Sequence, residues 1–403
     1  MSSKTIWIIN QYSGTPEHGM VYRSYYLAKE MIRQGHRVIV MSGSYSHLFR
    51  KFPDMKSTHQ FEMIDGIEYL WINVSPYGKS ISLGRFKAML QFAQRIKSVP
   101  MENMGKPDAI IVSSPSLLPV RTAYKWSRRF KANFLFEVRD IWPLSIQVMG
   151  QLSSAHPLVM LFRHFEKFGH KQADYSVSVL PNAKQHFIDA GMPEQRFVHI
   201  PNGIDLSEAD NALPVSNEVL SRFPKNKFIV GYAGTIGTAN AMNFLMEAVI
   251  RFKEQENIHF VVVGSGDKLE ELKAMVKDCS NITFIPPVPK RMVHSLIRMF
   301  DVCYMGMLND PLYSYGVSPN KIFDYLYSAR PVIFAVNSPG NPVERAGGVV
   351  IEPENTDALV SAIEKLYAMP EEQRNAIGAS GRNYVLQNHT YPALVQRYMT
   401  LIG

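Results

Sequence analysis

The chain has 403 residues, of which 46% are hydrophobic and 19% are charged. That length exceeds one ordinary hydrophobic core, and the composition is globular rather than disordered, so two domains are expected. The formal net charge of +8 indicates an anionic partner, which leaves nucleic acid, a phosphate-bearing substrate or an anionic membrane surface. No recognised nucleic-acid-binding module is evident, so nucleic acid is not expected as a partner.

Targeting and metal signals are also missing from the sequence. The first apolar run, 6–9, is too short for a signal peptide, and no run approaches the roughly eighteen apolar residues of a membrane span. Cys279 and Cys303 have no metal-type spacing and predict small buried thiols in a reducing compartment. With no Asp-x-Asp pair and no His or Cys cluster, a cytoplasmic protein working without metal or cofactor is expected.

Strand and helix signals alternate along the whole chain, which predicts an α/β fold with parallel sheets covered by helices. The periodicity of 22–34 predicts a helix that Gly35 ends, and 61–74 predicts a hairpin turning at Asp65-Gly66. The remaining strands are expected at 5–10, 37–42, 108–113, 133–138, 175–180 and 197–200, and again at 228–232, 259–263, 282–286, 302–305, 331–336 and 349–352.

A domain boundary is expected where turn chemistry, Pro201-Asn202-Gly203, follows the sixth strand and 206–226 turns polar and irregular. We expect an acceptor-side domain at 1–203, a second domain at 204–380, and C-terminal helices at 381–403 that pack back on the first. Two doubly wound, Rossmann-like domains would face a central cleft between their strand ends. This pattern alone fits a transferase, an epimerase or a two-lobed binding protein.

The strongest local signal is the segment 316–326, in which a glycine-containing loop leads into a helix expected to begin near Pro319. Free amides and the helix dipole at that end favour an anion, and Lys321 adds a full positive charge. Asp324, one turn later, is placed to accept hydrogen bonds from ribose hydroxyls. Together these features suit a ribose diphosphate. The alternative is an ordinary amphipathic helix with a core face of Ile322, Phe323 and Leu326.

The same segment resembles the donor-binding helix of retaining GT-B glycosyltransferases of family 4. Phe-Glu-Val-Arg-Asp-Ile-Trp-Pro at 136–143 resembles the block found in bacterial O-antigen and capsule transferases of the N-acetyl-L-fucosamine transferase type. The other matching segments, in the family's order, are 11–35, 199–205, 232–237 and 261–268.

The resemblance implies a nucleotide-sugar donor, UDP-linked by preference, bound in the second domain. Asp324 stands where the family usually has Glu, and Gly316 stands at the position of a second family glutamate. The stretch 235–243 lacks the Arg-Lys pair of many relatives, which leaves Lys321 as the main charge on the diphosphate. The implied donor-binding residues are Gly19, Gly234, Thr235, Val288, Gly316, Val317, Ser318, Asn320, Lys321 and Asp324.

In the first domain, Arg139 and Asp140 follow a predicted strand on the cleft side. Arg139 would stabilise phosphate charge rather than exchange a proton, so with Asp140 and Lys321 it completes the implied catalytic set. Trp142 and Arg23 are the implied acceptor-side residues, Trp142 by stacking on a sugar. The alternative for Arg139 and Asp140 is a buried pair that braces the strand end.

Three basic and aromatic stretches, at 83–99, 126–131 and 163–171, all fall in the first domain. An amphipathic helix with a cationic rim can lie on anionic lipid, so peripheral contact with the cytoplasmic face of the inner membrane is expected. The alternative is a helix packed on the sheet with solvated charges.

The expected activity is therefore retaining, metal-independent transfer of a sugar to a lipid-linked or glycan acceptor in O-antigen or capsule synthesis. The donor sugar suggested by the subgroup is an N-acetylated deoxy amino sugar. A nucleotide-sugar epimerase of GT-B shape, a non-catalytic two-lobed binding protein and a silent scaffold remain as alternatives. An epimerase would act on the donor with no acceptor present.

Overall fold

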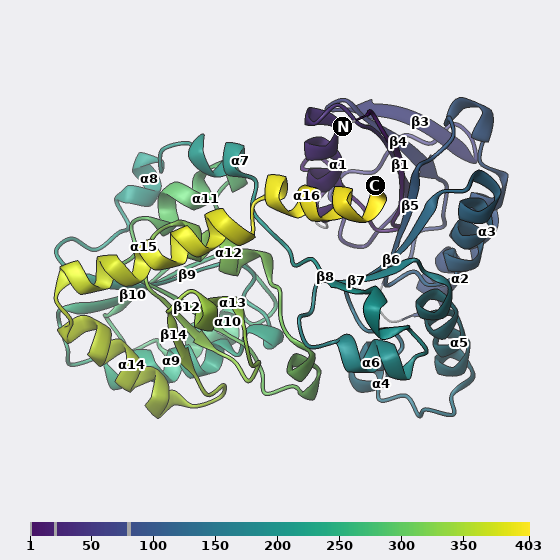
Figure 1. Cartoon of the computed structure of the whole chain (residues 1–403). Helices are drawn as coiled ribbons and strands as arrows, with labels where there is room; N and C mark the ends of the chain where they lie inside the picture. The colour runs from purple at the N-terminus through teal and green to yellow at the C-terminus, as the bar shows by residue number, and fades with distance from the viewer. Residues whose placement is uncertain (1, 20–21, 79–81) are drawn as a thin grey trace. The chain divides into compact units, whose positions relative to one another are not determined.

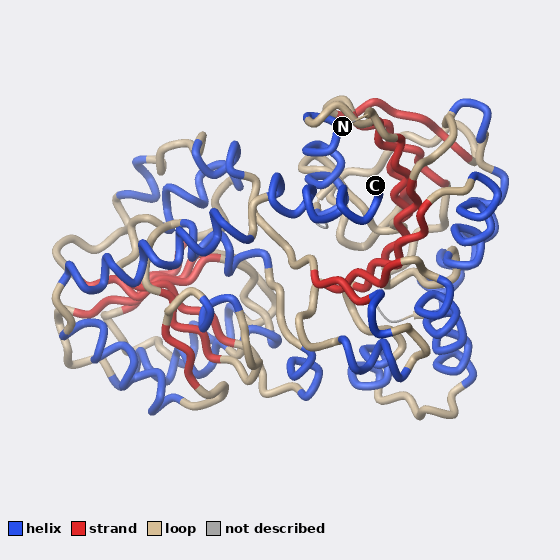
Figure 2. The backbone as a smooth tube through the Cα atoms, in the orientation of Figure 1, coloured by secondary structure: helices blue, strands red, loops and turns tan. Residues whose placement is uncertain are grey.

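The computed structural model describes residues 2–19, 22–78 and 82–403, which form two compact units (Figure 1). Unit 1 comprises 1–201 and 391–403, and unit 2 comprises 202–390. Each unit has a sheet flanked by helices, drawn red and blue in Figure 2. The boundary expected at 203/204 lies at 201/202. The boundary expected at 380/381 lies at 390/391, because residues 381–388 continue a helix of unit 2 and only the helix from Tyr391 onward joins unit 1.

The sheet of unit 1 has eight strands in the order β3-β4-β2-β1-β5-β6-β7-β8. The hairpin β3–β4 is antiparallel and turns at Asp65-Gly66, where both residues have positive φ, and the other pairs are parallel. The sequence therefore located this sheet correctly. Its strands are β1 (Thr5–Ile9), β2 (Arg37–Gly43), β3 (His59–Ile64), β4 (Ile67–Ile72), β5 (Ala109–Ser113), β6 (Asn133–Val138), β7 (Tyr175–Ser178) and β8 (Phe197–His199).

The helices of unit 1 have local features that fix their ends. Ser82 caps α2 by accepting from the Arg85 amide at 3.2 Å, and Lys131, in the left-handed region, ends α3. Pro157 begins α5, where its missing N–H costs nothing. These helices are α1 (Arg23–Arg33), α2 (Leu83–Arg95), α3 (Val120–Phe130), α4 (Leu144–Gly150), α5 (Pro157–Gln172), α6 (Lys184–Asp189) and the C-terminal α16 (Tyr391–Ile402).

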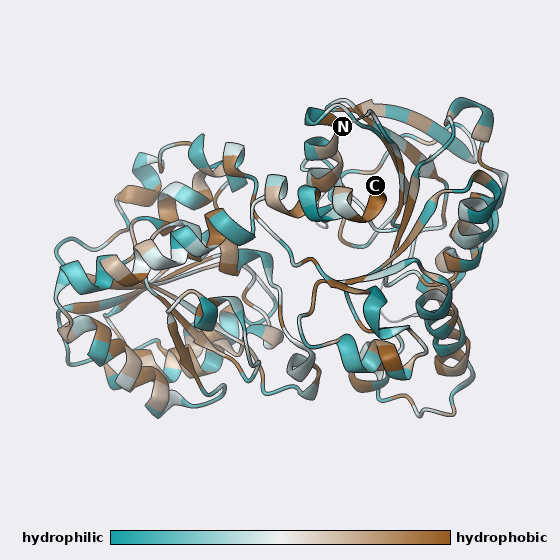
Figure 3. Ribbon diagram, viewed as in Figure 1, coloured by the Kyte–Doolittle hydropathy of each residue, from teal (hydrophilic) through white to brown (hydrophobic). Residues whose placement is uncertain are grey.

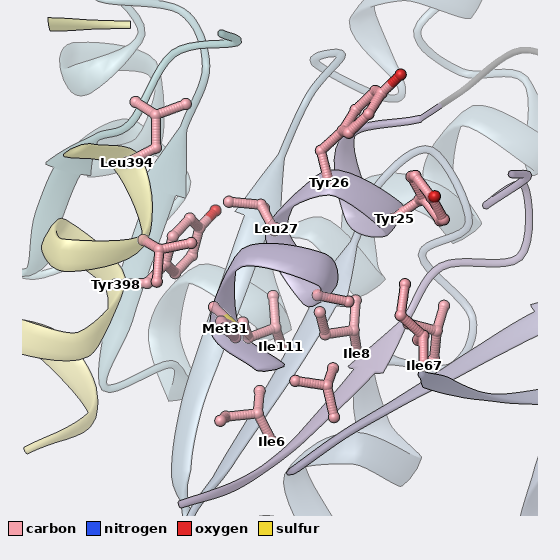
Figure 4. Close-up of a cluster of buried hydrophobic side chains, with 14 of the residues drawn as sticks. Ile6, Ile8, Tyr25, Tyr26, Leu27, Met31, Ile67, Ile111, Leu394 and Tyr398 are labelled. Atoms are coloured by element: carbon pink, nitrogen blue, oxygen red, sulfur yellow. The ribbon is translucent and has the colours of Figure 1, made fainter. Parts of the chain in front are cut away.

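The C-terminal helix is part of the core of unit 1. Leu394 and Tyr398 of α16 lie beside Leu27 and Met31 of α1, over strand residues such as Ile111 (Figure 4). All of these side chains are almost completely buried. Because apolar area removed from water is the main stabilising term, the last helix is needed for a stable first unit.

Unit 2 has a fully parallel six-stranded sheet in the order β11-β10-β9-β12-β13-β14. Parallel strands are covered on both faces, and the strands around β12–β14 are accordingly brown, the hydrophobic colour, in Figure 3. The strands are β9 (Phe228–Ala233), β10 (Ile258–Val263), β11 (Ile282–Ile285), β12 (Val302–Gly306), β13 (Val332–Ala335) and β14 (Val349–Ile351).

The polar segment after the boundary is more ordered than expected. Asp205 and Ser216 each accept a backbone N–H and so cap two short helices within 206–226. The helices of unit 2 are α7 (Leu206–Asp210), α8 (Asn217–Leu220), α9 (Met242–Arg251), α10 (Leu269–Met275), α11 (Lys290–Ile297), α12 (Asn320–Tyr327), α13 (Pro342–Arg345), α14 (Thr356–Ala368) and α15 (Glu371–Asn388). Across the described ranges, no helix is long and apolar enough to cross a membrane.

Candidate functional site

Two glycine loops meet at the carboxyl ends of the neighbouring strands β9 and β10. The Gly234 amide donates to the Val263 carbonyl at 2.9 Å, and a Cβ placed on Gly264 would lie 1.9 Å from the Gly234 oxygen. Gly234 and Gly264 have φ values of 155° and 149°, which L side chains rarely adopt. The sequence therefore needs glycine at both positions to bring the two backbones together at the edge where such sheets bind ligands.

Helix α12 is fixed against this edge by Tyr325. The amide of Ala233, the last residue of β9, donates to the Tyr325 hydroxyl at 2.8 Å, and that hydroxyl donates back to the Ala233 carbonyl at 3.1 Å. Pro319, the residue before the helix, provides no side-chain cap for its N-terminus. The N-terminal end of α12, with its partial positive charge, is thus anchored beside the Gly234 loop.

Lys321 lies over the Gly234 loop. Its Nζ donates to the Tyr232 hydroxyl at 2.7 Å, lies 4.4 Å from the centre of that ring, and is 3.4 Å from Asn240 Oδ1. The Tyr232 hydroxyl in turn donates to the Thr235 carbonyl. Burial lowers the pKa of Lys321 to about 8, against the opposing attraction of Asp324. A cation held this way is poised for an anionic ligand that would restore its charge.

Asp324 lies one turn further along α12, next to two groups of α11. His294 Nε2 is 3.5 Å from its Oδ1, and the charge of Lys290, which pairs with Glu208 at 2.6 Å, also acts on it. Burial raises the pKa of Asp324 to about 7, although its side chain is still 31% exposed and within reach of water. Burial lowers the pKa of His294 to about 4, so the imidazole is neutral near pH 7.

The loop ahead of α12 was expected to meet the donor through its backbone amides, and its side chains have other contacts within unit 2. Gly316 has a φ of 110°, where a glutamate would be strained, so backbone geometry accounts for a glycine at this position. Val317 is buried in the core, and the Ser318 hydroxyl accepts from the Asn202 amide at 2.9 Å. The side chain of Val317 is therefore not placed to meet a ligand, and ligand contact through the loop amides and Ser318 stays a prediction.

The other expected donor residues lie around the same edge. Thr235 and Asn320 are exposed, the first after β9 and the second in the first turn of α12. Val288 is half-buried in the loop between β11 and α11 and packs against the core with its side chain. The structure thus gathers nine of the expected residues in unit 2 around one edge, with Lys321 and Asp324 providing the charges, the full set being Gly234, Thr235, Val288, Gly316, Val317, Ser318, Asn320, Lys321 and Asp324.

In unit 1, Arg139 and Asp140 occupy the corresponding position after β6. Their amides both donate to the Ser114 hydroxyl, at 2.9 and 3.2 Å, which fixes the loop. Arg139 is half-buried and Asp140 is exposed at the surface of this unit. Trp142 follows on the same loop, half-buried, with its ring 5.3 Å from that of Phe162. The carboxyl end of β6 therefore presents an acid, a cation and an aromatic ring together.

Arg23 and Gly19 have structural roles that the sequence did not reveal. Arg23 is 2% exposed; it donates to Glu137 at 3.0 Å, to the Ile200 carbonyl at 2.8 Å and to the Tyr398 hydroxyl at 3.1 Å. It is a core residue that ties three parts of unit 1 together, in place of the expected acceptor contact. Gly19 is buried, with a φ of 111°, and a Cβ there would lie 2.9 Å from the Leu48 oxygen, so close backbone approach explains that glycine.

Three residues of the site were missed by sequence reasoning. Tyr232 and Asn240 hold Lys321, and His294 lies against Asp324. Tyr232 opens the segment 232–237 singled out from sequence, so its place was visible although its role was not. His294, on α11, carried no signal because only the tertiary fold brings it to α12. In the part of the chain that the structure describes, no three His, Cys, Asp or Glu side chains gather as a metal site would need.

Comparison with known proteins places this geometry in context. The family model of "Glycosyltransferase Family 4" matches residues 18–208, and that of "Glycosyl transferases group 1" matches residues 227–369. The putative colanic acid biosynthesis glycosyl transferase WcaI of Escherichia coli K12 is 22% identical over 66% of this chain and 68% of its own.

Solved structures show the same fold. Sucrose-phosphate synthase from Thermosynechococcus elongatus superimposes with a TM-score of 0.72 at 16% identity, over 99% of this chain and 98% of its own. Anabaena Alr3699/HepE, solved in complex with UDP and glucose, superimposes with a TM-score of 0.64 at 14% identity, over 98% of each chain.

The two α/β units and the two family-model matches identify a glycosyltransferase of the GT-B type. The chain is thus a glycosyltransferase, with the family 4 match lying mostly in unit 1 and the group 1 match lying within unit 2. It is related to the colanic acid biosynthesis transferase named above.

Proposed function

We propose that this glycosyltransferase binds a UDP-sugar in unit 2 and transfers the sugar, with retention of configuration, to an acceptor held by unit 1. The observation that carries the proposal is Lys321, held over the Gly234 loop beside the N-terminus of α12 with Asp324 one turn away. The amides and Lys321 would take the diphosphate, and Asp324 the ribose hydroxyls. HepE, a structure of the same fold, was solved with UDP and glucose bound, which supports this choice of donor.

The proposed mechanism needs no metal ion or other cofactor. As the bond to the sugar breaks, negative charge grows on the UDP diphosphate. The α12 amides and Lys321 would stabilise this charge without having to rearrange. Arg139, at the β6 edge, would add positive charge near the reacting centre, and Asp140 would orient the acceptor hydroxyl. Turnover should therefore survive a chelator, and its abolition by EDTA with recovery on adding Mg²⁺ would refute the metal-free mechanism.

The acceptor is proposed to be a lipid-linked glycan precursor in the synthesis of an envelope polysaccharide such as O-antigen or capsule. WcaI, named as a putative colanic acid transferase, supports a role of this kind. For the donor, the resemblance of 136–143 to N-acetyl-L-fucosamine transferases supports a UDP-linked N-acetylated deoxy amino sugar. A thermal-shift screen of nucleotide sugars tests this choice, because a ligand that binds only the folded state raises the melting temperature.

The same proposal includes contact with the cytoplasmic face of the inner membrane through unit 1. Helices α2, α3 and α5 together carry ten Lys and Arg residues but one acid, Glu166, which is buried against His186. Leu83, Leu90 and Met160 are exposed on two of these helices, by 88%, 46% and 58%. Exposed cations and exposed apolar side chains on the helices of one unit are complementary to an anionic lipid surface.

Vesicle sedimentation tests this surface. The chain should bind vesicles rich in phosphatidylglycerol, and this binding should weaken as the salt concentration rises. It should not bind vesicles of pure phosphatidylcholine. Replacing exposed Lys87, Lys125 and Lys167 with Gln should weaken binding several-fold, whereas replacing the same number of exposed lysines in unit 2 should not. Equal binding by both triple variants would remove the membrane contact.

The activity itself is tested by incubating the purified chain with the donor, with and without an acceptor extract from the envelope. UDP release that requires the acceptor supports a transferase. Conversion of the donor to a different sugar in the absence of acceptor would support the epimerase instead. Saturable UDP binding without turnover under any condition would leave a binding protein.

A further inference from the structure

Arg85 lies at the centre of a cluster of aromatic side chains at the carboxyl edge of the unit 1 sheet. Its Nε donates to the Tyr12 hydroxyl at 3.2 Å, and its guanidinium carbon lies 4.9 Å from the Tyr12 ring centre and 5.2 Å from that of Trp142. Its charge adds to the burial that lowers the pKa of His47 and opposes the burial that raises the pKa of Tyr77 to about 12, so it lies near both. We name the set Tyr12, Tyr45, His47, Tyr77, Arg85 and Trp142 the Arg85 cluster.

The aromatic members of the Arg85 cluster come from different strand ends, and Arg85 itself lies on α2. Tyr12 follows β1, Tyr45 and His47 follow β2, Tyr77 follows β4 and Trp142 follows β6. They contact one another: the Tyr45 hydroxyl donates to the Tyr77 carbonyl at 2.8 Å, and the Tyr77 hydroxyl lies 3.3 Å from His47 Nδ1. The fold therefore assembles these side chains at the edge where parallel sheets bind ligands.

The outer part of the cluster offers ring surface to a ligand. Phe52 stacks on Tyr45 with ring centres 5.0 Å apart and an interplanar angle of 11°, yet 47% of Phe52 is exposed. Tyr45 and Trp142 are half-buried, whereas Tyr12 and Tyr77 are buried beneath them. Exposed rings beside a polar edge suit the apolar face of a sugar, whose C–H groups stack on aromatic carbon.

The charge of the cluster is positive. Burial lowers the pKa of His47, with Arg85 adding to the effect, so this histidine is neutral at pH 7. Asp140 is the acid near Arg85, and Arg139 is a second cation acting on it. Glu137 also faces Arg139, and Arg23 is a third cation beside it, so three guanidinium groups against two acids leave a net positive charge. A guanidinium held between two rings is pre-organised for planar, bidentate contact with phosphate oxygens.

We propose that the Arg85 cluster is the acceptor subsite and that it recognises a sugar carrying a phosphate group, with the pyranose on Tyr45 and Trp142 and the phosphate on Arg85. The proposal deepens the function argued above and rests on it. It gives Arg85 the role of selecting phosphate-linked saccharides, as in a glycan on a lipid diphosphate, over neutral glycans.

The test uses the full chain and two soluble probes, glucose 1-phosphate and glucose. Calorimetry in saturating UDP should show that the phosphate-bearing probe binds measurably more tightly than glucose. Arg85→Gln should weaken glucose 1-phosphate binding at least about tenfold, and Arg85→Lys, which keeps the charge but loses the planar fork, should fall between. The matched control Arg121→Gln, on exposed α3, should bind as the parent does.

The UDP site in unit 2 and the acceptor subsite at Arg85 can be disproved independently of each other. Lys321→Ala should lower the affinity for UDP and leave that for glucose 1-phosphate unchanged. Arg85→Gln should lower the affinity for glucose 1-phosphate and leave that for UDP unchanged. Loss of UDP affinity in Arg85→Gln would mean that the variant is misfolded. In that case the glucose 1-phosphate affinities of Arg85→Lys and Trp142→Leu decide whether the subsite exists. Unchanged glucose 1-phosphate affinity in Arg85→Gln or Arg85→Lys, or an equal loss in Arg121→Gln, would overturn the proposal.

The ring surface has its own readout. Trp142→Leu should reduce glucose 1-phosphate affinity by a larger factor than inorganic phosphate affinity, because phosphate loses only the support that the ring gives to Arg85, whereas the sugar also loses its stacking surface. The ratio of the two affinities should therefore fall in this variant. A constant ratio would show that Trp142 does not contact the sugar, and the subsite as proposed would be wrong.

Discussion

Lys321 Nζ donates a hydrogen bond to the Tyr232 hydroxyl at 2.7 Å while lying 4.4 Å from the centre of the same ring. A Cβ on Gly234 would lie 2.5 Å from this ammonium, so the glycine leaves the space that the lysine occupies. Cation, ring and glycine loop thus form one unit, in which the strand end, the loop and α12 each place one member.

Replacing Lys321 with Ala should weaken UDP binding by about 1.5–3 kcal/mol, the worth of one charge-assisted contact, or roughly ten- to a hundred-fold. Calorimetry measures the change directly. Lys290→Ala, which removes a cation on neighbouring α11, serves as the control and should change the affinity less. Unchanged affinity in Lys321→Ala would remove this residue from the phosphate site.

Tyr232→Phe should separate the hydrogen bond from the ring. The variant keeps the aromatic face beneath Lys321 but loses the acceptor that fixes its Nζ, so the ammonium should become less ordered. UDP affinity should fall by about 0.5–1.5 kcal/mol, less than in Lys321→Ala. A loss as large as that of Lys321→Ala would mean that the phenol itself contacts the nucleotide.

Asp324 is predicted to recognise ribose. Asp324→Asn should weaken UDP binding more than it weakens binding of 2′,3′-dideoxyuridine diphosphate, since the dideoxy compound has no hydroxyls to donate to the carboxylate. The difference between the two losses, measured by calorimetry on the same variant, isolates the ribose contact. Equal losses for both nucleotides would show that Asp324 acts only on the local charge.

The affinity for UDP should depend on pH with a maximum between about pH 7 and pH 8. Asp324, with a pKa of about 7, must lose its proton to accept from ribose, so affinity rises as pH rises toward 7. Lys321, with a pKa of about 8, loses its charge above that pH, so affinity falls again. Asp324→Asn should flatten the acid side of the profile and Lys321→Gln the alkaline side.

The free energy of unfolding should also depend on pH through Asp324 and Lys321, and the direction of each effect can be predicted. The folded pKa of Asp324 is raised from 3.8 to about 7, so its contribution is full below pH 4 and is lost as pH rises through 7. The folded pKa of Lys321 is lowered from 10.5 to about 8, so its burial is costly below pH 8 and this cost is relieved toward pH 10.5. Denaturant unfolding of the parent and of each variant across pH 4–10 checks both signs.

The sequence was sufficient for the sheets because strand periodicity is local. Apolar runs placed each strand of both sheets, and turn residues placed the hairpin at Asp65-Gly66. The end of unit 2 was missed because Gly381, taken for the start of a separate segment, continues α15, packing against Leu326 of α12. The unit to which this helix belongs depends on tertiary packing that no local pattern encodes.

The candidate site was predictable only in part, for the same reason. Lys321 and Asp324 could be chosen because both belong to one helix and their spacing is fixed by its turn. Arg23 was misread because its partners, Glu137 and Tyr398, are more than a hundred residues away in sequence. Of the Arg85 cluster only Trp142 was predicted from the sequence, because the other members come from separate strand ends and from α2.

The buried group around Arg23 gives the strongest stability prediction. Arg23 and Arg139 lower the pKa of Glu137 although burial alone would raise it, and Tyr398 of α16 donates to the same carboxylate. Arg23→Met leaves this acid buried without its main partner, which should destabilise unit 1 by about 3–5 kcal/mol. Exposed Arg121→Met should cost much less.

Tryptophan fluorescence can follow this unit alone, because all four tryptophans, Trp7, Trp71, Trp126 and Trp142, lie within it. Urea unfolding monitored in this way should show an earlier transition in Arg23→Met, and adding Glu137→Gln should recover part of the loss because the unpaired charge is removed. Tyr398→Phe should cost about 1 kcal/mol, one hydrogen bond. If Arg23→Met unfolds at the same urea concentration as Arg121→Met, the buried pair of Arg23 and Glu137 does not stabilise the packing of α1, β6 and α16.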